Sequence, residues 1–393
     1  MRPVTVETID MRLNPTFAEL GDYPIARIQM RARDRRDAGL PVLDFSIGDP
    51  REPTPQFIVD ALRDSVPVVS QYPTAAGLIE LRRVIAGYVR RRFDVEVDPE
   101  TQVIPTSGAK EAIFNTPFAF IDREAGDGVV YPTPGYPVYD RGSLFAGAKL
   151  FPIELSGDFV LRAEQIPDEA WDRSRLVWTC SPHNPAGSVS TLQDIAGLYV
   201  RAVDADALLL SDECYADIYE EDVYPEGPMS ILQVAGEGSP GALSYLSLSK
   251  RSGMTGYRSG AIVGDPEAIA ALKALRATTG TASPEFVQGA AIAAWSDDDH
   301  ANERRAIFTE KRRVLRAAFD DLGFETVASH AGLYLWIRVD DDMAFTDRLL
   351  EDGIVVSPGR FFGPGGEGFI RLALVPTVEE CAAAADTLRA LLG

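Results

Sequence analysis

The sequence predicts an α/β fold, with a mostly parallel sheet between layers of helices and a smaller α+β domain after it. Short apolar runs alternate with amphipathic stretches from Thr101 to Gly264, a pattern typical of βαβ units. The run Leu208 to Leu210 is apolar without alternation, as expected for a strand covered on both faces. After Asp265 the pattern changes to long helices and then to further strands. Because 393 residues exceed what one core usually supports, we expect two domains.

The expected elements follow the chain in order. The strands of the large sheet are expected in TQVIPTSG, GVVYP, KLFPIEL, RLVWTC, ALLLSDE, LSYLSLS and GAIVG. Helices with apolar positions near helical period are expected over residues 78–92, 109–121 and 192–203. The later part predicts helices over 267–277, 284–295, 300–322 and 378–392, and strands over 333–339, 354–357 and 369–375. We therefore place a large domain at residues 51–283, a small C-terminal domain at 284–393, and an N-terminal arm that completes the small domain at 1–50.

Composition narrows the possible partners. A net charge of −21 disfavours nucleic acid and anionic membranes, which are bound through surplus Lys and Arg. No apolar signal core or stretch of about 18 apolar residues is present, so we expect a cytoplasmic protein without a membrane span. Three cysteines and three histidines without CxxC or HxxxH spacing predict no metal site. The absence of a GxGxxG fingerprint disfavours a nicotinamide cofactor.

The segment SLSKRSGMTGYRSG supplies an amine, hydroxyls and a guanidinium at fixed offsets. Lys250 can form a Schiff base with an aldehyde, while Ser247, Ser249 and Arg258 offer donors for a phosphate. These are the groups needed to hold pyridoxal phosphate. The alternative for Lys250 is a solvated lysine that follows a buried strand.

Two further segments carry polar side chains after apolar strands. In SDECYADIY, the carboxylate of Asp212 can keep a pyridine nitrogen protonated, which makes the ring a better electron sink. Tyr215 and Asn184, the latter in SPHNPAG, can donate hydrogen bonds to a phenolate oxygen on that ring. The alternatives are a helix cap for Asp212 and a turn asparagine for Asn184.

The segment TSGAKEAI leads from a strand into a helix through small residues. Backbone amides at Gly108, Ala109 and Lys110 can meet a phosphate there, although strand, glycine turn and helix often serve packing alone. In YPTPGYPVY an aromatic ring can stack on a cofactor, and we assign that role to Tyr136 rather than to Tyr131 or Tyr139.

In this order, SPHNPAG, SDECYADIY and SLSKRSGMTGYRSG resemble the conserved blocks of fold-type I pyridoxal-phosphate aminotransferases, classes I and II, and the resemblance covers nearly the whole chain. It implies a seven-stranded large sheet and a ping-pong transfer of an amino group between an amino acid and a 2-oxo acid. It also implies that Lys250 is the Schiff-base lysine and general base, and that Asp212 contacts the pyridine nitrogen. The other matched cofactor positions are Gly108, Ala109, Lys110, Tyr136, Asn184, Tyr215, Ser247 and Arg258.

The same resemblance implies substrate and partner contacts. Arg371, in FIRLAL, matches the arginine that clamps the substrate α-carboxylate, and Gly48, in SIGDP, matches a glycine whose amide assists it. Tyr72 matches a tyrosine that reaches the phosphate of the neighbouring subunit, so we expect a homodimer with shared active sites. The family block NPxNPTG is altered here at Ser181 and Ala186, but its second asparagine, Asn184, is retained.

The tracts YPTAAGLIELRRVIAGYVRRRF, DPETQVIPTSGAKEAIF and GTASPEFVQGAAIAAWSDDDH resemble bacterial succinyldiaminopimelate aminotransferases of lysine biosynthesis. This implies amino transfer between N-succinyl-LL-2,6-diaminopimelate and 2-oxoglutarate. Aspartate or alanine transamination and a carbon–sulfur β-lyase on the same scaffold are the alternatives. A cofactor-binding regulatory domain is disfavoured by the charge and by the absence of room for a DNA-binding module before Pro50.

Arg276 and Lys273 precede an expected pocket loop. They are either residues that bind a distal carboxylate of the substrate or exposed helix positions.

Overall fold

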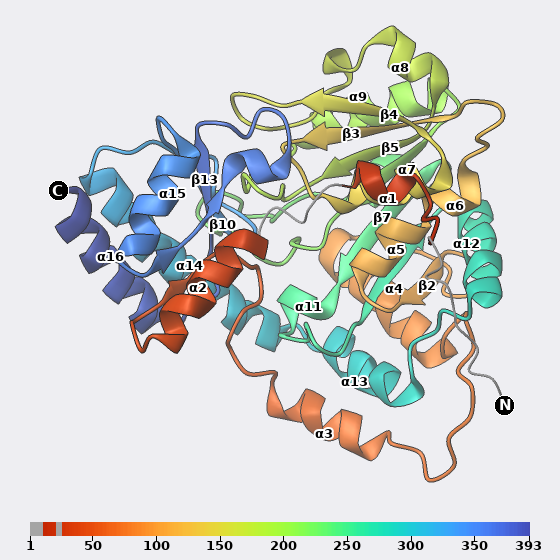
Figure 1. Cartoon of the computed structure of the whole chain (residues 1–393). Helices are drawn as coiled ribbons and strands as arrows, with labels where there is room; N and C mark the ends of the chain where they lie inside the picture. Colours follow the sequence, from red (N-terminus) through yellow and green to blue (C-terminus); the bar gives the residue numbers. More distant parts are fainter. Residues whose placement is uncertain (1–10, 21–25) are drawn as a thin grey trace, which may run out of the picture.

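The computed structural model describes residues 11–20 and 26–393, and its largest element is a seven-stranded sheet of order β2-β8-β7-β6-β5-β3-β4 (Figure 1). Each strand overlaps one of the seven predicted segments, and the predicted fold class is confirmed. The strands are β2 (Val103–Thr106), β3 (Gly128–Thr133), β4 (Lys149–Glu154), β5 (Ser174–Cys180), β6 (Leu208–Asp212), β7 (Ala242–Ser247) and β8 (Gly260–Gly264).

The strand directions bring several chain segments to one edge of this sheet. β8 runs antiparallel to β2 and β7, and the other neighbouring pairs are parallel. Cys180 therefore lies beside Asp212 at the carboxyl ends of β5 and β6. Gly260 pairs with both Thr106 and Ser247, which brings the end of β2 close to the end of β7. The loops that follow these strands meet at this edge, where ligands of parallel sheets bind.

Helices cover both faces of the sheet, as the unbroken apolar strands predict. Leu209 belongs to one buried cluster and Leu210 to another on the opposite face. The helices of this part are α3 (Gln56–Asp64), α4 (Ile79–Phe93), α5 (Ala109–Asn115), α6 (Pro117–Phe120), α7 (Val138–Ala146), α8 (Asp168–Arg173), α9 (Leu192–Asp204), α10 (Ile231–Ala235), α11 (Leu248–Arg251), α12 (Pro266–Thr279) and α13 (Glu285–Ser296). A short 3₁₀ turn, η1 (Ala163–Gln165), precedes α8.

Two predicted elements are divided in the structure. The helix expected over 109–121 is split into α5 and α6, because Pro117 has no N–H to continue the helical hydrogen bonds. The strand expected over 354–357 is two strands in different sheets, since β11 (Ile354–Val355) pairs with β1 (Leu43–Asp44) and β12 (Ser357–Pro358) pairs with β13 (Phe369–Ala373). Short strands of this kind carry too few residues for a sequence pattern to separate them.

The C-terminal part contains a separate four-stranded sheet of order β12-β13-β10-β9, with helices packed on it. Its core joins Phe308, Leu335 and Leu372. Its further elements are α14 (Asp299–Asp321), β9 (Thr326–Val327), β10 (Tyr334–Arg338), α15 (Asp342–Glu351), the 3₁₀ turn η2 (Gly359–Phe362) and α16 (Val378–Leu392).

The N-terminal segment lies against this C-terminal part, as Figure 1 shows for α2 (Ala26–Asp37). Ile28 and Ala32 of α2 share a buried cluster with Leu350 and Val355. A shorter helix, α1 (Thr16–Glu19), precedes it. The exact boundaries of the three predicted regions stay predictions.

No helix within residues 11–20 and 26–393 is long and apolar enough to cross a membrane. Over the same described ranges, no group of three or more His, Cys, Asp or Glu side chains is arranged to hold a metal ion. The cytoplasmic location stays a prediction.

Candidate active site

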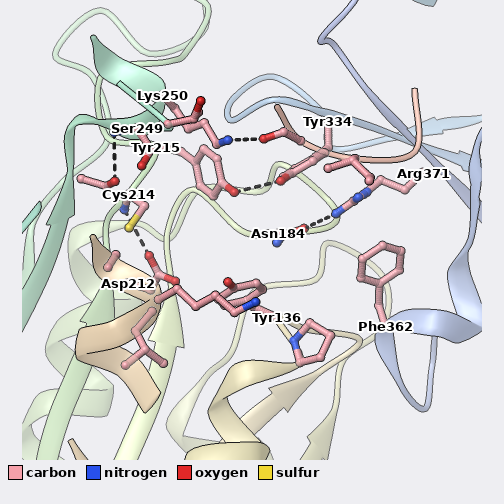
Figure 2. Close-up of a pocket in the computed structure, with 18 of the residues that line it drawn as sticks. Tyr136, Asn184, Asp212, Cys214, Tyr215, Ser249, Lys250, Tyr334, Phe362 and Arg371 are labelled. Carbon is pink, nitrogen blue, oxygen red and sulfur yellow. Dashed lines mark hydrogen bonds between the residues drawn. The ribbon is translucent and has the colours of Figure 1, made fainter. Parts of the chain in front are cut away.

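A cavity of about 530 Å³ opens where the carboxyl ends of the large-sheet strands face the C-terminal part (Figure 2). Its lining combines residues from both parts and from the segment after β1. Among the predicted site residues, the cavity is lined by Gly48, Ala109, Lys110, Tyr136, Asn184, Asp212, Tyr215, Ser247, Ser249, Lys250, Arg258 and Arg371.

Lys250 lies on α11, directly after β7, with its amine in the cavity. The Ser247 hydroxyl caps this short helix by accepting a hydrogen bond from the Ser249 amide at 3.1 Å. The Lys250 Nζ donates to the carbonyl oxygen of Gly48. Burial lowers the pKa of Lys250 to about 8, and the nearby Arg258 and Arg371 cations act in the same direction. The neutral amine is therefore accessible near physiological pH, which a solvated lysine would not offer.

Asp212 ends β6 and is buried at the base of the cavity. Its Oδ2 accepts a hydrogen bond from the Tyr139 hydroxyl at 2.7 Å, and its Oδ1 accepts one from the Cys214 amide at 3.2 Å. Burial raises the pKa of Asp212, while these two donors oppose the rise. Cys214 starts a turn rather than a helix, so Asp212 is not a helix cap. The carboxylate is thus fixed in orientation and lies next to the cavity.

Arg371, at the centre of β13, faces the cavity from the other side. Its Nη1 donates to Oδ1 of Asn184 at 3.0 Å, and its Nη2 donates to the carbonyl oxygen of Ser46 at 2.8 Å. Its guanidinium carbon lies 4.3 Å from the ring centre of Phe362. These contacts hold a buried cation at the cavity wall, and they join the turn that contains Asn184 to the C-terminal part.

Beside the cavity, the backbone at Gly108 and the guanidinium of Arg258 approach each other closely. Gly108 has φ +85°, and a Cβ added there would lie 2.6 Å from Nη2 of Arg258. Arg258 is held by a hydrogen bond from its Nη1 to the carbonyl oxygen of Thr255 at 2.9 Å. Ala109 and Lys110 begin α5 beside this arginine and line the cavity. Glycine at position 108 therefore leaves the space that lets Arg258 approach the start of α5.

Two of the predicted residues carry aromatic rings into the cavity. Tyr136 lies on the wall, with its ring centre 5.8 Å from that of Tyr139. The Tyr215 hydroxyl is hydrogen-bonded to the Tyr334 hydroxyl at 2.9 Å. Figure 2 shows Tyr215 between Lys250 and Tyr334, so its hydroxyl lies on the same side of the cavity as the amine.

Tyr72 and Gly108 are the predicted site residues that do not line the cavity, and the two candidate cations Arg276 and Lys273 do not line it either. Tyr72 is fully exposed and lines a different cavity, of about 730 Å³, together with Arg276. The alternative that Arg276 is an exposed helix position is wrong, because it is 3% exposed and its Nη1 contacts both carboxylate oxygens of Glu111, at 2.5 and 2.6 Å. Lys273 donates to the carbonyl oxygen of Glu100 at 2.7 Å. Neither cation lines the central cavity within one chain.

Sequence reasoning missed two tyrosines that hold site residues. The sequence offers Tyr139 only as a candidate stacking ring, yet its hydroxyl donates a hydrogen bond to Asp212. No motif in the sequence indicates Tyr334, although its hydroxyl forms a hydrogen bond with that of Tyr215. Its one signal is its position as the first residue of an apolar strand, which does not distinguish it from a core tyrosine.

The fold and this cavity define an enzyme of the transaminase type, and the chain belongs to the class I and II aminotransferase family, whose pattern matches residues 41–388. It is 33% identical over 381 residues to an LL-diaminopimelate aminotransferase of Aquifex aeolicus, across 95% of this chain and 97% of that protein. It is 36% identical over 350 residues to the 4-dedimethylamino-4-oxo-anhydrotetracycline transaminase OxyQ of Streptomyces rimosus, across 88% and 93%. Among solved structures, an aminotransferase of Neisseria meningitidis has a TM-score of 0.88 and 32% identity, across 97% of this chain and 100% of that one.

Proposed function

We propose that the cavity binds pyridoxal 5'-phosphate and that Lys250, Asp212 and Arg371 carry the transamination. The observation that supports this most strongly is that these three groups, from three distant segments, line one cavity. The donor set fits the cofactor: an amine with a lowered pKa for its aldehyde, a buried carboxylate for its ring nitrogen, and a guanidinium with serine hydroxyls for its phosphate. Glycine at position 108 lets the Arg258 guanidinium lie against the start of α5, which brings a cation next to the backbone amides proposed to hold the phosphate.

Each predicted residue has a distinct task in this proposal. Arg258, Ser247, Ser249 and the amides of Gly108 to Lys110 would hold the phosphate, and Tyr136 would stack on the ring. Asn184 and Tyr215 would donate to the ring oxygen. When bound, pyridoxal phosphate supplies a protonated ring that draws electrons from the substrate α-carbon. Asp212 maintains that protonation because its carboxylate is buried and fixed by Tyr139 and Cys214.

Lys250 would move the proton. Its neutral amine can accept a proton from the substrate α-carbon and deliver it to the C4′ carbon of the bound cofactor. Burial favours the neutral form, which makes the amine an effective base near its pKa of about 8. The Gly48 carbonyl, which accepts from Nζ, keeps the amine at the cavity wall.

The lowered pKa of Lys250 predicts a pH dependence for cofactor uptake. Lysine attacks an aldehyde only as the neutral amine, so uptake of pyridoxal phosphate by cofactor-free protein should speed up about tenfold per pH unit below pH 8 and level off above it. Stopped-flow absorbance measures this rate. A rate that keeps rising to pH 10 would indicate an ordinary lysine and contradict the assignment.

Arg371 would bind the substrate α-carboxylate through parallel hydrogen bonds. Arg371→Lys keeps the charge but removes the planar fork, so KM for the amino donor should rise roughly 10- to 100-fold. Steady-state kinetics with glutamate tests this expectation. The matched control is Arg338→Lys, because Arg338 lies on neighbouring β10, is half exposed and pairs with Glu325. Equal KM values in Arg371→Lys and Arg338→Lys would contradict the proposal that Arg371 binds the substrate carboxylate.

For the substrate we propose N-succinyl-LL-2,6-diaminopimelate with 2-oxoglutarate, in lysine biosynthesis. Support comes from the sequence resemblance and from relatives named LL-diaminopimelate aminotransferase at 32–34% identity. Their name favours LL-diaminopimelate without the succinyl group as a second candidate. Parallel assays with both compounds, aspartate and alanine, each with 2-oxoglutarate, separate these substrates by kcat/KM. A preference for aspartate or alanine would overturn the diaminopimelate proposal but not the enzyme class.

A carbon–sulfur β-lyase needs the same cavity groups and is the second reaction that this scaffold could support. The relatives and the family favour transamination. Release of pyruvate from cystathionine faster than amino transfer from glutamate would favour the lyase.

We also propose a homodimer with shared active sites, because Tyr72 is exposed within one chain and lies outside the cavity it was predicted to complete. Light scattering should give twice the mass of 42.7 kDa. Mixing inactive Lys250→Ala and Tyr72→Ala proteins should restore activity, since one mixed site carries both native residues. A monomeric mass would contradict the proposal.

A further inference from the structure

Tyr334 connects two groups of the cavity that come from different parts of the fold. It is the first residue of β10, it is 3% exposed, and its hydroxyl lies 2.9 Å from that of Tyr215 in the loop after β6. The guanidinium carbon of Arg371 lies 4.2 Å from the centre of its ring. Figure 2 shows Tyr334 with Tyr215 on one side and Arg371 on the other.

The position of this ring is closely defined by its surroundings. A Cβ added at Gly48 would lie 2.7 Å from the Tyr334 hydroxyl, so glycine at position 48 leaves room for the ring. Residues 48 and 334 thus fit against each other beside Lys250, whose amine donates to the Gly48 carbonyl. On its other side, Arg371 lies between Tyr334 and the ring of Phe362.

The hydroxyls of Tyr215 and Tyr334 share one hydrogen bond, in which one of them donates and the other accepts. The proton of the accepting hydroxyl is then available for another partner. Burial raises the pKa of both Tyr215 and Tyr334, so both hydroxyls are protonated at neutral pH. The Arg371 guanidinium lies 4.2 Å from the centre of the Tyr334 ring, and this adjacent cation opposes the rise in the pKa of Tyr334, so it favours Tyr334 as the hydrogen-bond donor of the pair. When Tyr334 donates, the Tyr215 oxygen is an acceptor toward Tyr334 and its own proton is available to the cavity.

We propose that Tyr334 is a positioning residue for amino transfer. Its hydroxyl donates to Tyr215 and thereby directs the Tyr215 proton toward the cofactor ring oxygen, while its ring supports the guanidinium of Arg371 through a cation–π contact. This inference rests on the proposed roles of Tyr215 and Arg371. The contact with Tyr215 crosses between the two parts of the chain, while Arg371 lies on β13, the strand next to β10 in the same sheet. A single side chain thus aligns the cofactor side of the cavity with the substrate side.

The two contacts can be separated by two substitutions. Tyr334→Phe removes the hydroxyl and keeps the ring, so kcat should fall about three- to tenfold with little change in KM for the amino donor. Tyr334→Leu removes the ring as well, so KM should additionally rise roughly 2- to 30-fold because Arg371 loses its aromatic support. A KM that rises equally in both variants would overturn the proposed division of roles.

A double-variant cycle tests whether Tyr334 acts through Tyr215. Tyr334→Phe should shift the wavelength of the bound cofactor's absorption band in the same direction as Tyr215→Phe. In protein that already carries Tyr215→Phe, it should cause no further decrease in kcat and no further shift of the band. Tyr245→Phe is the matched control, because Tyr245 is also buried and makes a hydroxyl–hydroxyl contact, with Thr116 at 2.7 Å, outside the cavity lining. It should leave band, kcat and KM unchanged.

The outcomes separate this inference from the proposed function. If Tyr215→Phe alone changes neither the band nor kcat, the assigned role of Tyr215 fails, and with it the basis of the inference. If Tyr215→Phe acts but Tyr334→Phe is silent or fully additive, the proposed function stands and the positioning role of Tyr334 is wrong. Thermal unfolding of each variant confirms that the comparison is made on folded protein.

Discussion

Lys250→Ala is expected to lower the rate of transamination by about 10²- to 10⁴-fold or more, the contribution of a positioned acid–base group. The fold should persist, because within the described residues the Lys250 amine has one hydrogen-bond partner, the Gly48 carbonyl. Alanine also favours the helical conformation of α11. Turnover with glutamate and 2-oxoglutarate measures the loss, and thermal unfolding checks the fold.

The matched control for this substitution is Lys273→Ala. Lys273 lies on α12, contacts the carbonyl oxygen of Glu100 and does not line the central cavity. Its loss should leave turnover within about twofold of the unsubstituted protein, as for a surface change. Normal turnover in Lys250→Ala would show that another group carries the proton transfer.

Asp212→Ala is expected to lower kcat by at least about 10²-fold, because an uncompensated ring nitrogen loses its proton and the ring then draws electrons poorly. The substitution also leaves the Tyr139 hydroxyl without the acceptor that it bonds at 2.7 Å. Binding of pyridoxal phosphate should weaken in the same variant, which titration of the cofactor absorption measures.

A cofactor analogue distinguishes the electrostatic role of Asp212 from a structural one. Pyridoxal phosphate methylated at its ring nitrogen carries a fixed positive charge and does not depend on a carboxylate for it. This analogue should restore a large part of the activity of Asp212→Ala. Equal activity with both cofactors would mean that Asp212 is needed for the architecture and not for the charge.

The sequence predicted those parts of the site that follow from strand ends. Asp212, Asn184 and Lys250 come directly after apolar runs, and parallel strands bring such positions to one edge, so their meeting was predictable. The large sheet was predictable for the same reason, since Leu209 and Leu210 belong to cores on opposite faces.

Contacts that depend on tertiary packing could not be predicted in this way. The hydrogen bond of Tyr334 to Tyr215 joins residues 119 positions apart, and no local pattern specifies it. Arg276 was expected either on the surface or in the pocket, yet a carboxylate from Glu111 on another helix holds it in a buried ion pair. The sequence pattern predicts one strand over residues 354–357 where the structure has β11 and β12, because each of these strands is only two residues long.

The absorption spectrum of the purified protein with pyridoxal phosphate tests the central proposal most directly. Our account predicts a visible band for the bound cofactor in the unsubstituted protein, converted to that of pyridoxamine phosphate when glutamate is added and restored by 2-oxoglutarate. In Lys250→Ala the conversion should be at least about 10²-fold slower. A protein that shows no band with the cofactor, or a band that glutamate leaves unchanged, would contradict the assignment of this cavity as the site of amino transfer.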